Sequence, residues 1–275
     1  MKIYDLHSHS LKSDGKLAPS ALVQRAHEKG VDFLALTDHD ITDGIDEALA
    51  AAQELALTLI PGVEISATWE NRTLHVVGLN IDMTNTALQT GLSSIREQRA
   101  ARALQIGDQL AKLGIPDAHE GASRIAQGAI LSRTHFAEYM VREGHAKDFS
   151  RAFRDWIGDR GKAFVKTRWA PLQDAIDWIN AAGGQAVIAH PGRYRLGKSQ
   201  LKKLFADFTD MGGAAMEVVS GSQKSDDTGY FARETVRHGL LASAGSDFHD
   251  PQYPWRELGR NLRLPEECTP VWKDW

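Results

Sequence analysis

The chain of 275 residues contains a single cysteine, Cys268, so no disulfide can form within it. One thiol is also too few for a cysteine-based zinc site, which uses two to four. No uninterrupted apolar run approaches the ~20 residues that a transmembrane helix needs, and no hydrophobic leader follows the first two residues. We therefore expect a cytoplasmic protein with no membrane partner.

The chain also lacks a large excess of either charge. Its 32 basic and 36 acidic residues give a formal net charge of −4. A balance of this kind does not favour stable binding to duplex nucleic acid. Hydrophobic residues make up 42% and charged residues 25%, as in ordinary globular proteins. The composition gives no indication of the oligomeric state.

Short apolar runs alternate with helical patterns in the first and last thirds of the chain, as in an α/β sheet or barrel with helices outside. The predicted helices are 19–29, 44–55, 172–181, 199–208 and 226–238. The predicted strands are 3–6, 33–36, 59–65, 74–79, 185–189, 215–219 and 240–244. In the middle third, apolar residues follow helical spacing without a strand between them. We expect an α/β barrel from 1–83 and 166–275, with a helical insertion, or cap domain, at 84–165.

Histidines and carboxylates occur at or near the predicted strand ends. His7 and His9 leave the first strand on the same side, because residues i and i+2 of an extended chain share a face. The carboxyl ends of parallel strands form the active-site face of α/β proteins, so the other members are expected to join them. Imidazole and carboxylate together favour Zn, Mn, Fe or Co over Ca or Mg. The complete set is His7, His9, Asp14, His39, Glu64, His75, His190, Asp247 and His249.

These residues belong to motifs that resemble the PHP (polymerase and histidinol phosphatase) family of metal-dependent phosphoesterases. The motifs are H-S-H (7–9), T-D-H-D (37–40), P-G-V-E-I-S (61–66), His75, A-H-P (189–191) and G-S-D-F-H (245–249). Within this family, the chain resembles bacterial nucleoside-3′,5′-bisphosphate phosphatases, some of which also shorten RNA from its 5′ end. The resemblance implies a distorted β/α barrel of seven strands.

The resemblance also implies a cluster of two to three divalent transition metal ions, with manganese expected and zinc or iron as alternatives. The implied first site is His7, His9, Glu64 and Asp247. Glu64 would bridge to a second site that His75 and His190 complete, and a third site would be formed by Asp14, His39 and His249. The implied nucleophile is a metal-bridging hydroxide held by Glu64 and Asp247, because bound metal lowers the pKa of water.

The expected reaction is hydrolysis of a phosphate monoester on a small nucleotide, most simply the 3′-phosphate of a nucleoside 3′,5′-bisphosphate. The second phosphate of that substrate would need its own cationic ligands. Arg133 and His135 follow Ser132, a predicted N-cap, and a helix N-terminus beside an arginine favours anions. Arg193 lies three residues after His190, and its guanidinium matches phosphate geometry. These three residues are the predicted substrate ligands.

Three other functions remain open from the sequence. A 5′-to-3′ exoribonuclease acting on short RNA would need stacking aromatics such as Trp69, Tyr194 or Trp255. The other two are a phosphatase for a metabolite such as histidinol phosphate and a metal-bound regulatory module without turnover.

Two further carboxylates could each have one of two roles. Asp40 either orients an imidazole or stabilises a turn, and Glu217 either faces the site or makes hydrogen bonds at the edge of the core.

Overall fold

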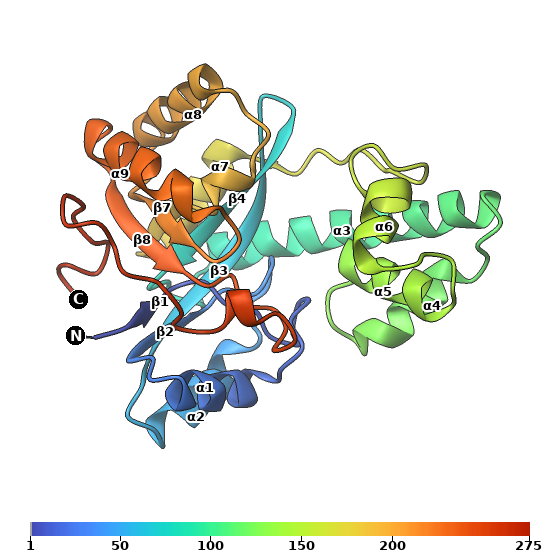
Figure 1. The fold of residues 1–275 in the computed structure, drawn as a ribbon, viewed down its shortest axis with the longest axis horizontal. Helices are drawn as coiled ribbons and strands as arrows, with labels where there is room; N and C mark the ends of the chain where they lie inside the picture. The colour runs from blue at the N-terminus through green and yellow to red at the C-terminus, as the bar shows by residue number, and fades with distance from the viewer. Residues whose placement is uncertain (1) are drawn as a thin grey trace. The chain divides into compact units, whose positions relative to one another are not determined.

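One mixed sheet organises the first and last thirds of the chain in the computed structural model, which describes residues 2–275 (Figure 1). Its strands are β1 (Tyr4–Asp5), β2 (Phe33–Leu36), β3 (Thr58–Trp69), β4 (Arg72–Leu79), β5 (Ala170–Pro171), β6 (Gln185–Ile188), β7 (Ala215–Ser220) and β8 (Leu241–Gly245). The order is β1-β2-β3-β4-β6-β7-β8, and the short β5 pairs with β3. Pairing is parallel except at β4, which is antiparallel to both neighbours.

The two edges of this sheet meet beyond β1 and β8. The amide of Leu6 donates to the carbonyl of Ala244 at 3.0 Å, and the amide of His9 donates to the carbonyl of Phe248 at 2.9 Å. The seven-stranded path is therefore nearly closed. This architecture confirms the predicted distorted α/β barrel.

Helices cover the outside of the barrel (Figure 1). They are α1 (Pro19–Glu28), α2 (Ile45–Gln53), α7 (Leu172–Ala181), α8 (Lys198–Asp210) and α9 (Thr228–Arg237). Helix α1 illustrates their construction. Pro19 starts it with a preset φ, and Leu22, Val23 and Ala26 form its buried face at helical spacing. All five helices match predicted ones to within three residues at either end.

Strands β3 and β4 form a hairpin longer than the sequence pattern predicts. The turn residues Glu70 and Asn71 have φ values of 45° and 65°, the backbone of a tight hairpin turn that follows the strand twist. The ladder consequently runs from Gly62 opposite Leu79 to the turn. Placing Glu64 at a strand end was therefore wrong, because it lies within β3. His75, opposite Ser66, likewise lies inside β4.

The chain divides into two compact units, Met1–Leu92 with Ala170–Trp275, and Ser93–Trp169. The second contains most of α3 (Thr86–Lys112), together with α4 (Ala118–Ala126), α5 (Arg133–Arg142), α6 (Phe149–Ala152) and a π-helical turn, Phe153–Ile157. Buried Ile106, Leu110, Phe136 and Met140 belong to its core.

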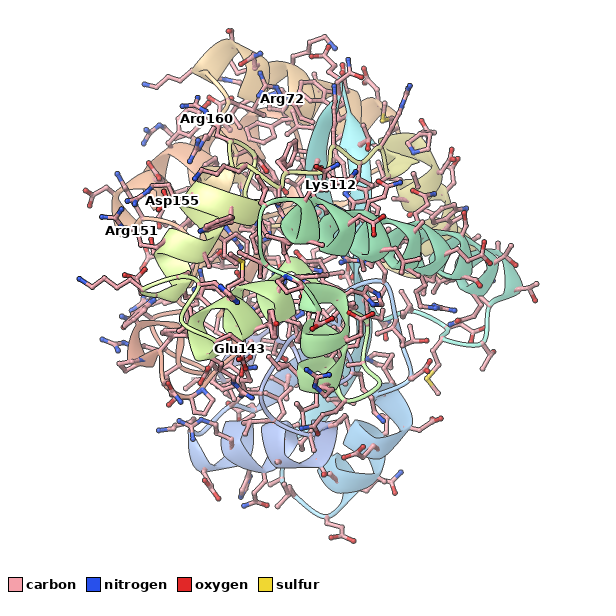
Figure 2. All side chains as sticks on the ribbon, turned by 90° about the vertical axis from the view of Figure 1, so that its right-hand side faces the viewer. Arg72, Lys112, Glu143, Arg151, Asp155 and Arg160 are labelled. Atoms are coloured by element: carbon pink, nitrogen blue, oxygen red, sulfur yellow. The ribbon has the colours of Figure 1, made fainter. Side chains whose placement is uncertain are left out.

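The surface of the helical unit carries paired charges. In Figure 2, Arg151 and Asp155 lie side by side, 3.6 Å apart at one helical turn. Because both side chains are exposed, a pair of this kind contributes little stability.

No strand occurs within the described residues 93–169. Among all described residues, no helix is both long and apolar enough to span a membrane.

Candidate metal centre

The carboxylate of Glu64 lies at the centre of a cluster of imidazoles. Its Oε1 atom is 2.9 Å from both His75 Nδ1 and His190 Nε2. Its Oε2 atom is 3.0 Å from His39 Nδ1 and 3.3 Å from the Nε2 atom of each histidine in the H-S-H motif. Each oxygen thus faces a different set of ring nitrogens, as a bridge between two ions requires.

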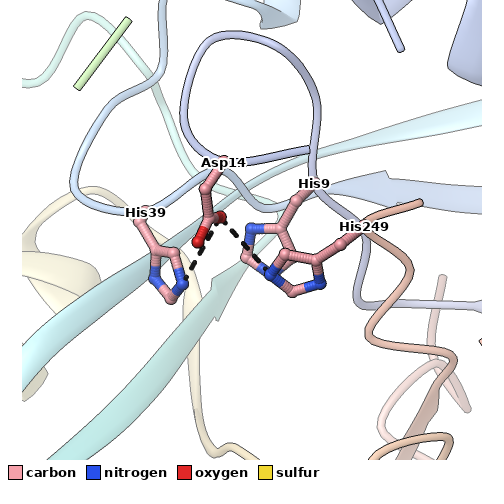
Figure 3. Close-up of side chains that lie close together, drawn as sticks. All are labelled: His9, Asp14, His39 and His249. Carbon is pink, nitrogen blue, oxygen red and sulfur yellow. Dashed lines mark ion pairs between the residues drawn. The ribbon is translucent and has the colours of Figure 1, made fainter. Parts of the chain in front are cut away.

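Two other carboxylates complete the cluster. Asp247 Oδ1 is 3.6 Å from His7 Nε2 and 3.4 Å from His9 Nε2. Asp14 lies between two imidazoles in Figure 3, with Oδ1 3.3 Å from His249 Nε2 and 3.9 Å from His39 Nε2. The structure therefore brings together all nine residues that the sequence nominated.

Local backbone geometry places these side chains at close range. Asp247 and His190 have φ values of 53° and 31°, in the left-handed region that costs non-glycine residues energy and is enriched at functional sites. A Cβ atom at Gly245 would lie 2.3 Å from His7 Cβ, so only glycine allows β8 to pass so closely. The ring N–H of His249 donates to the carbonyl of Asp247 at 2.9 Å, which leaves its other nitrogen facing the cluster.

The donor set fits metal ions. In three overlapping groups, each residue offers a ligand atom within 4.8 Å of the others: His9, Asp14, His39 and His249; His7, His9 and Glu64; and His39, Glu64 and His75. Ring nitrogens of His7 and His9 face each other at 3.1 Å, and buried Nδ1 atoms of His9 and His190 have no hydrogen-bond partner among the described residues. The groups overlap at His9, His39 and Glu64.

In the metal-free protein, burial and the charges of neighbouring side chains determine which candidate ligands are protonated. Burial alone would raise the pKa of Glu64, but His39, His75 and His7 hold it well below the usual value. Burial opposes a charge on His9, yet Asp247 and Glu64 outweigh it and raise that pKa to about 9. Burial lowers the pKa of His190 to about 4. An incoming metal therefore meets an ionised carboxylate and a neutral His190, but has to displace a proton from His9.

The family model described as PHP domain matches residues 5–186. The chain belongs to the PHP domain family. It is 45% identical to a 3′,5′-nucleoside bisphosphate phosphatase of Chromobacterium violaceum, over 98% of this chain and 95% of that relative. It is 46% identical to a 5′-3′ exoribonuclease of Haemophilus influenzae, over 99% of this chain and 98% of the relative. A solved C. violaceum amidohydrolase with bound sulfate and no metal superposes with a TM-score of 0.93, at 45% identity over 98% of this chain and 94% of that one.

Glu217 lies beside the candidate metal centre, and the sequence left its role undecided. It lies on β7 and is 1% exposed. The ring N–H of His7 donates to its Oε1 atom at 2.6 Å, and the amide of His190 donates to its Oε2 atom at 2.5 Å. Glu217 therefore orients one candidate ligand through its ring and another through its backbone. A charged residue inside the apolar run A-M-E-V-V was the available signal.

Replacing Glu217 by Gln is expected to weaken metal binding by ~10–100-fold, the usual effect of losing a partner that orients a ligand. A neutral amide keeps the size, but its NH₂ group has to face either the His7 N–H or the His190 N–H. Competition with a coloured chelator measures the change. Glu28→Gln on the exposed end of α1 is the control. Equal metal affinity in the two variants would show that Glu217 does not position the ligands.

Asp40 accepts hydrogen bonds from Ser66, at 2.7 Å from the amide and 3.0 Å from the hydroxyl. Its φ of 55° also makes it a turn residue. These contacts tie the loop after β2 to β3 and support the turn interpretation of Asp40.

Two arginines lie beside the metal centre. Arg193 Nη1 is 3.2 Å from Asp247 Oδ2, and Arg256 Nη1 is 3.7 Å from the same oxygen. Arg256 was missed by the sequence analysis. It belongs to a 3₁₀ turn, Pro254–Arg256, nine residues after Asp247, and no motif marks it.

The other predicted substrate ligands belong to the helical unit. Ser132 caps α5 as predicted, accepting the amide of Thr134 at 3.2 Å. His135 Nδ1 accepts the Ser132 amide at 3.1 Å, so His135 has a capping role. Arg133 Nη1 lies 3.2 Å from Asp159. Arg193 therefore lies beside the candidate ligand Asp247 in the first unit, whereas Arg133 and His135 belong to the second unit.

Proposed function

We propose that this PHP protein hydrolyses phosphate monoesters of small nucleotides, with the 3′-phosphate of nucleoside 3′,5′-bisphosphates as its main target. The products would be a 5′-nucleotide and phosphate. The observation that carries the proposal is the convergence of six histidines and two aspartates with the buried Glu64. The 45% identity to the C. violaceum bisphosphate phosphatase, over nearly the whole of both chains, supports this choice of substrate.

We assign two to three divalent transition metal ions, preferably manganese, to the nine residues. The proposed first set is His7, His9, Glu64 and Asp247; the second is Glu64, His75 and His190; the third is Asp14, His39 and His249. Bound metal supplies Lewis-acid charge and lowers the pKa of coordinated water. Glu64, with its two oxygens facing different imidazoles, is the proposed bridging carboxylate.

The chain's own residues would bind and orient the phosphate. Arg193 and Arg256 bring two guanidinium groups to the side of Asp247, where they offer hydrogen bonds to phosphoryl oxygens. Stabilisation of developing negative charge by fixed donors lowers the barrier to phosphoryl transfer. Arg133 and His135 remain the proposed ligands of the second phosphate.

A second candidate activity is 5′-3′ exonuclease action on short RNA, which the 46% identity to the H. influenzae enzyme favours. Of the three aromatic residues nominated for base stacking, Trp69 is 4% exposed and donates its ring N–H to Asp207. The hydroxyl of Tyr194 donates to the Ala189 carbonyl. Trp255 is 62% exposed and is the best placed to stack on a base.

A substrate panel tests the proposed function. Purified protein with manganese would be offered a nucleoside 3′,5′-bisphosphate, 3′- and 5′-monophosphates, histidinol phosphate, a generic aryl phosphate and 5′-phosphorylated short RNA. Release of phosphate from the bisphosphate at the highest kcat/KM supports the proposal. Preferential release of mononucleotides from RNA would replace it with the exonuclease. No turnover of any compound would leave a non-catalytic metal-bound module.

Metal content gives an independent prediction. We expect about two to three transition metal ions per chain after gentle purification, measured by elemental analysis. Because the raised pKa of His9 keeps it protonated near neutral pH without metal, binding displaces a proton and weakens as the pH falls. The expected loss is ~10-fold per pH unit for each displaced proton. Less than one ion per chain, without activation by Mn, Zn, Fe or Co, would contradict the assignment.

A further inference from the structure

Three arginines of the helical unit line a single hollow. Arg99 and Arg102 come from α3 and Arg133 from α5, while Ser132 and Phe136 form part of the same lining. The hollow is shallow: water-sized molecules can be centred in about 10 Å³ of it, and its empty volume is about 220 Å³ when the open mouth is included. We call it the arginine hollow. It is made of residues 99–136 alone and uses none of the nine candidate metal ligands.

The guanidinium groups of Arg99 and Arg102 both lie over the ring of Trp169, 5.1 and 5.3 Å from its centroid. Residues three apart share one face of a helix, which explains how a single indole contacts both. Arg99 is only 9% exposed. The indole thus makes a cation–π contact with both guanidinium groups, a kind of contact that does not consume their N–H donors.

Arg102 shows that the positive charge of the hollow is incompletely compensated. Its Nε atom is buried and has no hydrogen-bond partner among the described residues. Burial, and then the charges of Arg133 and Arg99, lower the pKa of Arg102 to about 9. The carboxylate of Asp159 pairs with Arg133 at 3.2 Å, but it is 78% exposed and therefore strongly screened. A buried donor without an acceptor is costly, so an anion in the hollow would be stabilising.

The first turn of α5 adds to the positive electrostatic potential of the hollow. Helix α5 has ten residues, and its N-cap Ser132 lines the hollow together with Arg133. The first turn of a helix carries a partial positive charge and favours an anion. The rest of the lining is apolar and consists of Ala103, Ile106, Leu131 and Phe136.

We propose that the arginine hollow is a phosphate-binding site, with Arg99 and Arg102 as ligands in addition to Arg133. A phosphate dianion supplies several acceptor oxygens to guanidinium forks and compensates the clustered cations. The inference deepens the proposed function by adding two ligands for a second phosphate. It rests on that function only in identifying the molecule that carries the phosphate group.

Calorimetric titration of inorganic phosphate into the full chain, stripped of metal by a chelator, tests the site directly. Arg102→Gln is expected to weaken binding at least ~10-fold, because it removes one charged fork. Arg142→Gln is the matched control, since Arg142 lies on α5 of the same unit, is 62% exposed and pairs with Glu138. Circular dichroism would show whether each variant is folded. If Arg102→Gln does not fold, Arg99→Gln tests the same site.

A second titration with a nucleoside 3′,5′-bisphosphate identifies the carrier of the phosphate group. Parallel weakening of both ligands in Arg102→Gln supports a site for a substrate phosphate, and weakening of inorganic phosphate alone supports a site for the free anion. Undiminished phosphate binding in folded Arg102→Gln and Arg99→Gln would overturn the proposal, as would absence of binding to the wild type. Because no turnover is measured, failure of the proposed enzymatic function would appear separately, in the substrate panel.

Discussion

Replacing Glu64 by Gln is expected to reduce kcat/KM by at least ~100-fold, a loss of about 2.7 kcal/mol or more in transition-state stabilisation. Glu64 is fully buried, and its two oxygens lie 2.9 to 3.3 Å from ring nitrogens of five histidines. Neither of the other two candidate carboxylates lies as close to ring nitrogens of as many histidines. Its removal should therefore weaken two proposed metal sites together.

The substitution preserves size and changes charge. A glutamine amide has one acceptor oxygen and one donor NH₂, so only one set of imidazoles would still face an acceptor. The other set would face a donor that cannot bind a cation. We therefore expect metal content to fall along with activity.

The hairpin itself provides the control for this experiment. Glu70 lies at its turn, is about half exposed and pairs with Lys203 at 3.0 Å. Glu70→Gln should retain wild-type activity and metal content. Both quantities would be measured for both variants, by steady-state kinetics and by elemental analysis. A fully metallated Glu64→Gln protein with near wild-type kcat/KM would refute the bridging role.

Removing the second phosphate from the substrate is expected to have a comparable effect. A 3′,5′-bisphosphate offers one phosphate to the metal centre and another that the protein can bind separately. Binding energy from a non-reacting group can orient the reacting one, so its loss lowers kcat as well as affinity. We expect a 3′- or 5′-monophosphate to show a kcat/KM lower by orders of magnitude. Equal turnover of monophosphates and bisphosphate would indicate a broader phosphatase.

Arg133→Ala tests the protein side of this interaction. It should cost ~1.5–3 kcal/mol on the bisphosphate, the range of a charged hydrogen bond, while a generic monoester is barely affected. Arg142→Ala on the same helix is the control, because its side chain is exposed and pairs with Glu138. The measurement is kcat/KM for both substrates in both variants. Equal losses on both substrates in Arg133→Ala would contradict a role specific to the second phosphate.

The structure changes the expectation for Arg193. Its guanidinium lies 3.2 Å from Asp247, a candidate metal ligand. Arg193→Ala should therefore impair the bisphosphate and the generic monoester alike. This pattern would separate a residue that acts at the reacting phosphate from one that acts at the second phosphate.

Most members of the candidate metal centre could be predicted from the sequence, because strand geometry is local. Alternation places His7 and His9 on one side of the chain, and the loops after parallel strands lead to the same end of the barrel. The apolar periodicities that define α1 and α7 likewise depend on residues close in sequence. These features require no knowledge of distant contacts.

Only the tertiary structure decided the features that depend on distant segments. His7 and Glu217 are 210 residues apart, and their hydrogen bond exists because the sheet places β7 near the continuation of β1. The position of Glu64 inside β3 depended on a hairpin turn, Glu70-Asn71, that lacks the common Asn-Gly signal.

The surroundings of three arginines were likewise decided only by the tertiary structure. Arg256 is an ordinary loop residue in the sequence, and its proximity to Asp247 depends on the path of the chain after β8. Arg99 and Arg102 could be read as exposed helix charges, until folding places Trp169 against both of them. Local patterns therefore determined which residues can bind metal, whereas long-range packing decided which side chains orient those residues and which cations surround them.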